Sequence, residues 1–165
     1  MRTSRVAVVG AGASALVLDL VRRGYQSLDA VDLAEAALDQ LAGLLGDDAR
    51  KVRCVCADVR EVGFDGLIDV WHDRATFHFL TSPIDQAAYV RRASAAVRPG
   101  GHIVLATFSE RGPAQCSGLP VARHSVATLS DRFAGSFELM STFERDHTTP
   151  WGTPQSFTHA LLRRH

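Results

Sequence analysis

Two glycines and an aspartate near the start of the chain have the spacing of a nucleoside-binding site. Gly10, Ala11 and Gly12 form a turn between an apolar segment and a helix-like segment, and Asp32 ends the next apolar segment. Glycines let a ligand approach the backbone, and the start of a helix offers unpaired N–H groups. An acid at the position of Asp32 accepts hydrogen bonds from ribose hydroxyls in such units. We therefore expect these residues, together with Leu33, to bind the nucleoside part of a cofactor.

The glycine turn alone fits more than one kind of site. Gly10, Gly12 and Ala15 match the Gly-x-Gly-x-x-Ala fingerprint of NAD- and FAD-binding proteins. A single fingerprint has a substantial rate of false matches. Two alternatives therefore accompany the hypothesis: an NAD(P)-binding site, and a turn that serves only the packing of a strand against a helix.

A second group of chemically active side chains follows an apolar segment near residue 70. Trp71, His72, Asp73 and Arg74 leave a strand that we expect over about 67–71. Ligands of open α/β sheets lie beyond the carboxyl ends of the strands, so we expect His72 and Asp73 at the reacting centre. His72 is able to accept a proton, because the unperturbed pKa of histidine is about 6.5, and Arg74 is suited to an acidic substrate group or the carboxylate of a cofactor. The alternative is that Asp73 pairs with Arg74 or with the backbone and caps the next helix.

Two further histidines are candidate bases. His78 follows Arg74 by four residues and shares a face with it if 75–80 is helical, although a buried structural histidine is an equally good interpretation. His147, with Trp151, belongs to the turn that we expect between the last two strands; it is a candidate second base, or it only shapes the turn. The seven histidines have no HxH or HExxH spacing and the three cysteines no CxxC spacing, so we expect no metal site.

The hydrophobic pattern alternates between strands and helices along the chain. We expect parallel strands over about 5–9, 28–32, 52–57, 67–71 and 102–108, and helices over about 14–23, 34–45, 85–97 and 125–133. The segment 109–124 has the composition of a loop, and two final strands over about 136–145 and 155–163 predict an antiparallel hairpin. The fold class is therefore α/β: a single domain, residues 1–165, with a doubly wound, mostly parallel seven-stranded sheet and a C-terminal antiparallel hairpin.

The overall charge excludes some classes of partner. Eighteen basic residues balance eighteen acidic ones, so no net field attracts nucleic acid or an anionic membrane. No apolar stretch approaches the roughly 20 residues that cross a bilayer, and the first residues do not resemble a signal peptide. Cys54 and Cys56 point the same way on one strand, and neither they nor Cys116 suggest a disulfide. We expect a cytoplasmic protein with no membrane or nucleic-acid partner.

Several motifs, taken together, resemble the class I S-adenosylmethionine-dependent methyltransferases. These are Ala57-Asp58-Val59 after the third strand, Ile68-Asp69-Val70 in the fourth, VRPGGHIVLATF at 97–108 and the closing hairpin. The resemblance implies a Rossmann-like methyltransferase fold and S-adenosyl-L-methionine as the cofactor. It implies that Gly10, Ala11 and Gly12 line the cofactor, that Asp32 binds its ribose, and that Asp58 and Val59 bind its adenine.

Within that family, the chain resembles a bacterial subgroup of small methyltransferases. The residues that carry this likeness are WHDRATFHFLTSPIDQAAYVRRA at 71–93, CSGLPV at 116–121 and TPWGTPQSF at 149–157. The subgroup is distantly similar to thiol and protein-lysine methyltransferases. The resemblance implies methyl transfer to an N, S or O atom of a small-molecule acceptor, and it does not identify that acceptor.

The chain departs from the family pattern in two places. Val8 stands where the first strand usually carries an acid, and only Met1–Ser4 precede that strand, where the family usually has one or two helices. A non-methylating binding module, or a cyclase or rearrangement enzyme on the same scaffold, is therefore the second hypothesis, and an NAD(P)-binding protein the third.

Apolar surface around an open cleft is commonly covered by a partner, so we expect a homo-oligomer.

Overall fold

The computed structural model describes residues 3–149 and 152–165. Its strands are β1 (Val6–Val9), β2 (Leu28–Asp32), β3 (Val52–Cys56), β4 (Ile68–Arg74), β5 (Val97–Phe108), β6 (Gln115–Cys116), β7 (Leu119–Pro120), β8 (Phe137–Thr148) and β9 (Pro154–Arg164). Its helices are α1 (Ala15–Arg22), α2 (Glu35–Leu45), α3 (Pro83–Ala96) and α4 (Val126–Phe133), with 3-10 turns η1 (Gly46–Lys51) and η2 (Phe77–Phe79).

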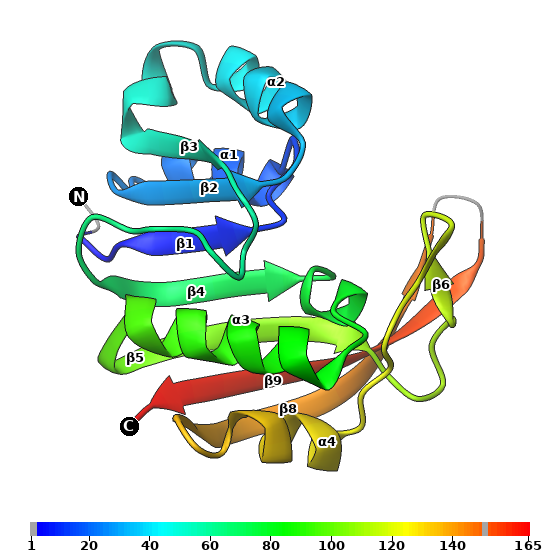
Figure 1. The fold of residues 1–165 in the computed structure, drawn as a ribbon. Coiled ribbons are helices and arrows are strands. Elements are labelled where there is room, and N and C mark those ends of the chain that lie inside the picture. The colour runs from blue at the N-terminus through cyan, green and yellow to red at the C-terminus, as the bar shows by residue number, and fades with distance from the viewer. Residues whose placement is uncertain (1–2, 150–151) are drawn as a thin grey trace.

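One seven-stranded sheet organises the described residues. Its strand order is β3-β2-β1-β4-β5-β9-β8, and the first five strands in that order are parallel. The last two strands, β9 and β8, run antiparallel to their neighbours. The predicted fold class is confirmed, including the closing hairpin (Figure 1).

Apolar side chains on the two faces of the sheet form two cores. Val8 and Ala30 belong to the core beneath α1 and α2, whereas Val9 and Trp71 belong to the core beneath α3 and α4. Successive strand residues point to opposite faces, so an almost continuously apolar strand such as β1 feeds both cores. Figure 1 shows α3 and α4 on one face of the sheet and α1 on the other.

Helix ends follow local sequence signals. Ser14 caps α1 by accepting a hydrogen bond from the Leu16 N–H, and Ser82 caps α3 in the same way through Asp85, with Pro83 at the first helical position. Gly24, with φ +88°, follows α1 in the left-handed region that favours glycine. These helices lie within one or two residues of the predicted boundaries.

Three predicted boundaries are wrong. β4 continues to Arg74, because its partners β1 and β5 offer backbone hydrogen bonds along 70–74, so the polar residues of 71–74 lie within the strand and not after it. β5 begins at Val97, because Ile68 pairs with that residue ahead of an irregularity in the register. The predicted loop 109–124 contains a small antiparallel pair, β6 and β7, which we call the flap.

The hairpin of β8 and β9 is longer than predicted. The two strands pair from Phe137 with Arg164 to Thr148 with Pro154. His147 therefore lies in β8, opposite Gln155, and not in the turn. The far half of this hairpin, from the pair of Phe143 with His159 to the pair of Thr148 with Pro154, projects beyond the rest of the sheet, and we call it the arm (Figure 1). Trp151, predicted to shape the turn, lies outside the described residues.

Candidate functional site

The main pocket lies at the carboxyl ends of the central parallel strands, next to the flap. It has a volume of about 650 Å³. Residues that follow β1, β2, β3 and β4 line it, and Leu119 and Pro120 of the flap close one side. The strand order reverses between β1 and β4, with β2 and β3 on one side and β5 on the other, so this edge is the point at which an open α/β sheet binds ligands.

Thr76, which follows β4, contacts the glycine turn after β1. Gly10 has φ +61°, and a Cβ atom added to it would lie 1.9 Å from Thr76 Oγ1. The Thr76 hydroxyl in turn donates to the Val9 carbonyl at 3.2 Å. Another residue at this position would have to displace Thr76 and adopt a left-handed backbone, so the site favours glycine, and Thr76 is a member of the site that the sequence analysis missed. Gly12 also has a positive φ, of +50°, but open space surrounds it.

Asp32 holds the same turn from the other side. Its Oδ2 accepts a hydrogen bond from the Gly12 backbone N–H at 2.8 Å, and its Oδ1 accepts one from the Ala34 N–H at 2.9 Å. A carboxylate has about four acceptor positions, so two stay available to a ligand in the main pocket, which Asp32 lines. Leu33 lies at the rim with 72% of its surface exposed.

Asp58, Arg60 and Asp85 line the main pocket and form an acid–base–acid arrangement. The Arg60 guanidinium donates to Asp58 Oδ1 at 2.9 Å and Oδ2 at 2.5 Å, and it also donates to Asp85 at the start of α3. Hydrogen bonding to Arg60 holds the pKa of Asp58 below its usual value, so Asp58 is ionised at neutral pH. Val59 lies beside them, almost fully buried. The sequence analysis missed Arg60 and Asp85, because their meeting depends on how α3 packs.

A second pocket of about 460 Å³ lies on the opposite side of Gly10. Val8, Ser14, His72 and Arg74 are among its lining residues, as is Gly10 itself. Burial is the main cause that lowers the pKa of His72, and the charge of Arg74 adds to it. His72 is therefore neutral at pH 7, and its Nδ1 atom is buried with no hydrogen-bond partner among the described residues.

The fold and a family comparison agree on the class of protein. Residues 6–101, more than half of the chain, match the family model of the methyltransferase domain. The chain belongs to this methyltransferase family. No curated protein sequence matches it. The resemblance to class I S-adenosylmethionine-dependent methyltransferases is thus confirmed, and S-adenosylmethionine is the cofactor of that class.

Solved methyltransferase structures share the fold at low sequence identity. A methyltransferase from Methanosarcina mazei superposes with a TM-score of 0.83 at 14% identity, over 99% of this chain and 93% of that one. The 1,6-didemethyltoxoflavin N1-methyltransferase of Burkholderia thailandensis, with its substrate and S-adenosylhomocysteine bound, gives 0.80 at 21%, over 99% and 72%. The N-methyltransferase NodS of Bradyrhizobium japonicum, with S-adenosylhomocysteine, gives 0.75 at 14%, over 98% and 78%.

Residues of this methyltransferase fit the cofactor of the class. Gly10 lines the main pocket together with Asp32 and Asp58, and no atom lies within 4 Å of a Cβ placed on Gly12. Apolar walls from Val31 and Phe79 complete it. A nucleoside needs this combination of close backbone approach, hydroxyl and amine acceptors, and apolar ring contacts.

The structure corrects the expected placement of Asp73. Its side chain is fully buried in the core beneath α3 and does not face either pocket. The carboxylate accepts hydrogen bonds from the Tyr89 hydroxyl at 2.6 Å, the Thr76 N–H at 2.9 Å and the Phe77 N–H at 3.1 Å. The alternative, in which Asp73 caps the next turn through the backbone, describes what the structure shows.

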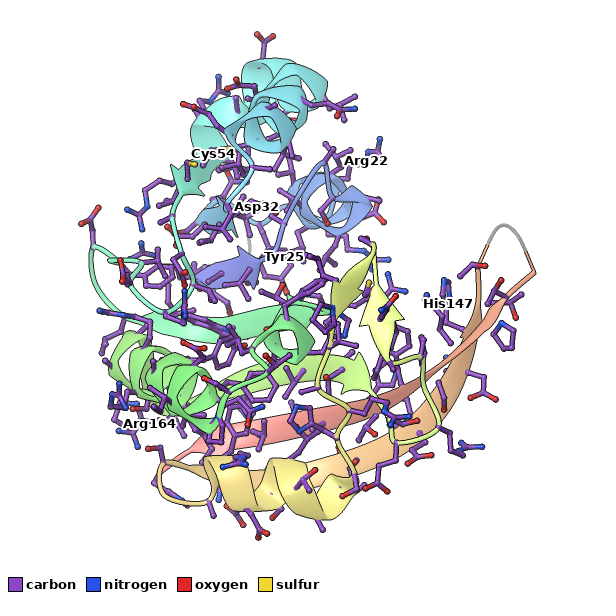
Figure 2. The ribbon with its side chains drawn as sticks, turned by 45° about the vertical axis from the view of Figure 1, so that its right-hand side comes forward. Arg22, Tyr25, Asp32, Cys54, His147 and Arg164 are labelled. Carbon is purple, nitrogen blue, oxygen red and sulfur yellow. The ribbon has the colours of Figure 1, made fainter. Side chains whose placement is uncertain are left out.

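His78 and His147 lie apart from the pockets of this methyltransferase. His78 is fully buried, with neither ring nitrogen hydrogen-bonded within the described residues, and burial lowers its pKa to about 4. His147 is exposed on the arm, and Figure 2 shows it far from Asp32. Neither lines a pocket that contains the glycine turn.

Two further observations apply to residues 3–149 and 152–165. In this part of the chain no three histidine, cysteine or acidic side chains gather in a way that could hold a metal ion. Its helices include none that is long and apolar enough to span a membrane.

Proposed function

We propose that the protein is an S-adenosylmethionine-dependent methyltransferase that acts at an N, S or O atom of a small molecule. The observation that carries the proposal is the main pocket, in which Gly10 of the glycine turn, Asp32 and Asp58 line one cavity, and Asp32 also binds the Gly12 N–H. A cavity of about 650 Å³ is of the size that small-molecule and cofactor sites have.

Four residues of the main pocket have specific parts in binding. Asp32 accepts hydrogen bonds from the ribose hydroxyls with the acceptor positions that Gly12 and Ala34 leave available. Asp58, kept ionised by Arg60, accepts from the adenine amino group. Val59 and Phe79 contact the faces of the ring, from which they exclude water.

Alignment of the acceptor is the main contribution of the protein to the reaction. When bound, the cofactor supplies a sulfonium methyl group, whose bond to sulfur is exchanged for a bond to the acceptor atom, leaving a thioether. The imidazole of His72, which lines the second pocket and is neutral at pH 7, accepts the proton that such an acceptor releases. Arg74, in the same second pocket, binds an anionic group.

Calorimetric titration with S-adenosylmethionine, S-adenosylhomocysteine and NADH tests the cofactor. We expect the first two to bind and NADH not to bind. Incubation with S-adenosylmethionine and a library of small metabolites, followed by mass spectrometry, then tests turnover through the gain of one methyl group. Binding of NADH without S-adenosylmethionine would contradict the proposal.

A non-methylating role on the same scaffold is the second candidate. Val8, which lines the second pocket, provides no acid to bind the amino group of a methionine moiety. A protein of this kind would bind S-adenosylmethionine or S-adenosylhomocysteine, or catalyse a cyclisation or rearrangement, without forming a methylated product. The mass-spectrometric screen separates the two candidates, because only a methyltransferase converts S-adenosylmethionine to S-adenosylhomocysteine.

A homo-oligomeric state remains part of the proposal. Leu33 and Leu119, which line the main pocket, have 72% and 58% of their surfaces exposed, and exposed apolar surface of this kind is commonly covered by another chain. We expect light scattering at micromolar concentration to give at least twice the mass of one chain. A strictly monomeric species would contradict this part.

A further inference from the structure

One face of the sheet carries a row of side chains from four neighbouring strands. The strand register places Arg74 beside Ala106, Ala106 beside His159, and His159 beside Phe143. Directly paired residues point to the same face of a sheet, so these four side chains share one face. Phe157 and Arg145 are paired in the next row and share it too.

The aromatic and cationic groups in these rows contact one another. The Phe143 and His159 rings are stacked, with centroids 4.6 Å apart and planes at 7°. The Arg74 guanidinium carbon lies 5.6 Å from the centroid of the Phe157 ring. We call the surface made by Arg74, Phe143, Arg145, Phe157 and His159 the arginine–aromatic face.

Positive charge on this face is not balanced by acids. Within residues 3–149 and 152–165, neither Arg74 nor Arg145 forms an ion pair. Alternation along β8 directs Glu144 to the opposite face, where Arg111 pairs with it at 2.8 Å. The pKa of His159 is lowered by burial first and then by the charges of Arg74 and Arg145, as expected where cations gather without acids. A chain with no net charge thus has a local cationic surface.

The arginine–aromatic face is accessible at Arg74, Phe143 and Arg145 and adjoins both pockets, whereas Phe157 is buried at its base, where Cys116 and Val121 pack. Phe143 has 55% of its surface exposed, and both arginines are exposed. Arg74 lines the second pocket, and the two residues after it, Ala75 and Thr76, line the main pocket. A ligand on this face would therefore lie next to the pocket proposed for the cofactor.

We propose that the arginine–aromatic face binds the acceptor, and that the acceptor is a planar aromatic molecule bearing a carboxylate or another oxyanion. The guanidinium groups of Arg74 and Arg145 bind the oxyanion, because arginine presents paired donors that match a carboxylate. Because the stacked Phe143 and His159 rings cover one face of each other, the acceptor ring stacks on an outer face of this pair. This inference rests on the proposed function, since it specifies the substrate class of the same site.

Binding of 2-naphthoate and of the uncharged 2-naphthamide to the protein tests the inference. We expect the wild-type protein to bind the carboxylate at least about tenfold more tightly than the amide, and Arg74→Gln to abolish most of that preference. Phe143→Ala should weaken both ligands by a similar factor, because it removes the ring contact and leaves the charge. Arg111→Gln is the matched control and should change neither affinity, because Arg111 pairs with Glu144 on the opposite face of the arm.

Several outcomes would overturn the inference. These are equal binding of the two probes, no binding of either, or an unchanged preference in Arg74→Gln. A single-stranded oligothymidine that binds this face more tightly than 2-naphthoate would assign it to nucleic acid instead. Affinity for S-adenosylhomocysteine, measured on the same samples, separates a failure of the proposed function from a failure of this inference. Loss of that affinity contradicts the proposed cofactor site, whereas the comparison of 2-naphthoate with 2-naphthamide tests the acceptor alone.

Discussion

Tyr89 donates its hydroxyl hydrogen to the Asp73 carboxylate at 2.6 Å, deep beneath α3. The Trp71 indole N–H donates to the same Tyr89 oxygen at 2.8 Å, so three residues of two elements form one buried chain of hydrogen bonds. Burial raises the pKa of Asp73 to about 6, although hydrogen bonds from Tyr89 and from the Thr76 and Phe77 N–H groups oppose the shift, and the carboxylate is mostly ionised at pH 7. The acid therefore fixes the end of β4 to α3, and we expect it to take no part in the chemistry of the site.

Tyr89→Phe should destabilise the fold by about 2–4 kcal/mol, because it leaves Asp73 one donor short and the Trp71 N–H without an acceptor. Urea unfolding followed by fluorescence measures the change. The affinity of the remaining folded protein for S-adenosylhomocysteine should stay within about twofold, since none of the three residues lines a pocket. A large loss of affinity without a loss of stability would mean that Asp73 acts at the site.

Asp32→Ala should abolish measurable cofactor binding. The change removes the proposed acceptor of the ribose hydroxyls and also the bond that holds the Gly12 N–H. Calorimetry with S-adenosylhomocysteine checks it, with Asp39→Ala on the exposed side of α2 as the control. Micromolar affinity retained in Asp32→Ala would remove Asp32 from the site.

The two glycines of the turn should respond differently to alanine. Gly10→Ala forces a Cβ atom against Thr76 Oγ1, whereas Gly12→Ala meets no atom within 4 Å. Both variants incur about 1–2 kcal/mol for a left-handed residue, so the excess loss of stability in Gly10→Ala measures the clash. Thermal unfolding of the two variants compares them directly. Equal losses would show that Thr76 moves away without cost.

Asp58→Asn should weaken cofactor binding about tenfold. An amide is a weaker acceptor than the carboxylate for the adenine amino group, and a charged partner contributes about 1.5–3 kcal/mol to such a bond. Asp85→Asn is the control, because it also removes one of the two acids bound to Arg60 but is not proposed to contact adenine. Equal weakening in both variants would show that Arg60, and not Asp58, is the important group.

Acidification should destabilise the protein between about pH 6.5 and pH 4. Burial lowers the pKa of both His78 and His124 to about 4, so the unfolded chain, with histidines near 6.5, binds more protons in this range. Their stabilising effect is complete above pH 6.5 and is lost as the pH falls through the range, on the order of 1–3 kcal/mol per histidine. Asp73 acts in the opposite direction, since its raised pKa favours the folded state as the pH falls from 6. It is one group, however, and the lowered pKa values of His72 and His159 act in the same direction as those of His78 and His124.

Urea unfolding at pH 7.5 and pH 5 measures this dependence. The double variant His78→Leu with His124→Leu should flatten it, and His147→Asn, which changes an exposed histidine on the arm, should leave it unchanged. A profile in the double variant as steep as that of the wild-type protein would show that other groups cause the acid sensitivity.

Local chemistry let the sequence predict most of the fold. The Gly10–Gly12 turn, the serine caps and the alternation of apolar segments each depend on neighbouring residues, so β1, α1, β2 and α2 lie close to their predicted ranges. The end of β4 was misplaced because polar residues there form strand hydrogen bonds with β1 and β5, which are distant in sequence. The composition of a segment does not indicate which distant strands pair with it.

The sequence by itself determined the fold class, the cofactor turn and the position of Asp32, because short-range spacing fixes these features. Only the tertiary structure decided which side chain of 72–74 is buried: Asp73 points to the core beneath α3, and His72 and Arg74 point to the opposite face. Strand alternation predicts that neighbouring side chains point to opposite faces of the sheet, but the packing of α3 decides which of the two faces is covered. Packing likewise brought Thr76 to Gly10 and Asp85 to Arg60, and it aligned Arg74 with His159 and Phe143 across four strands.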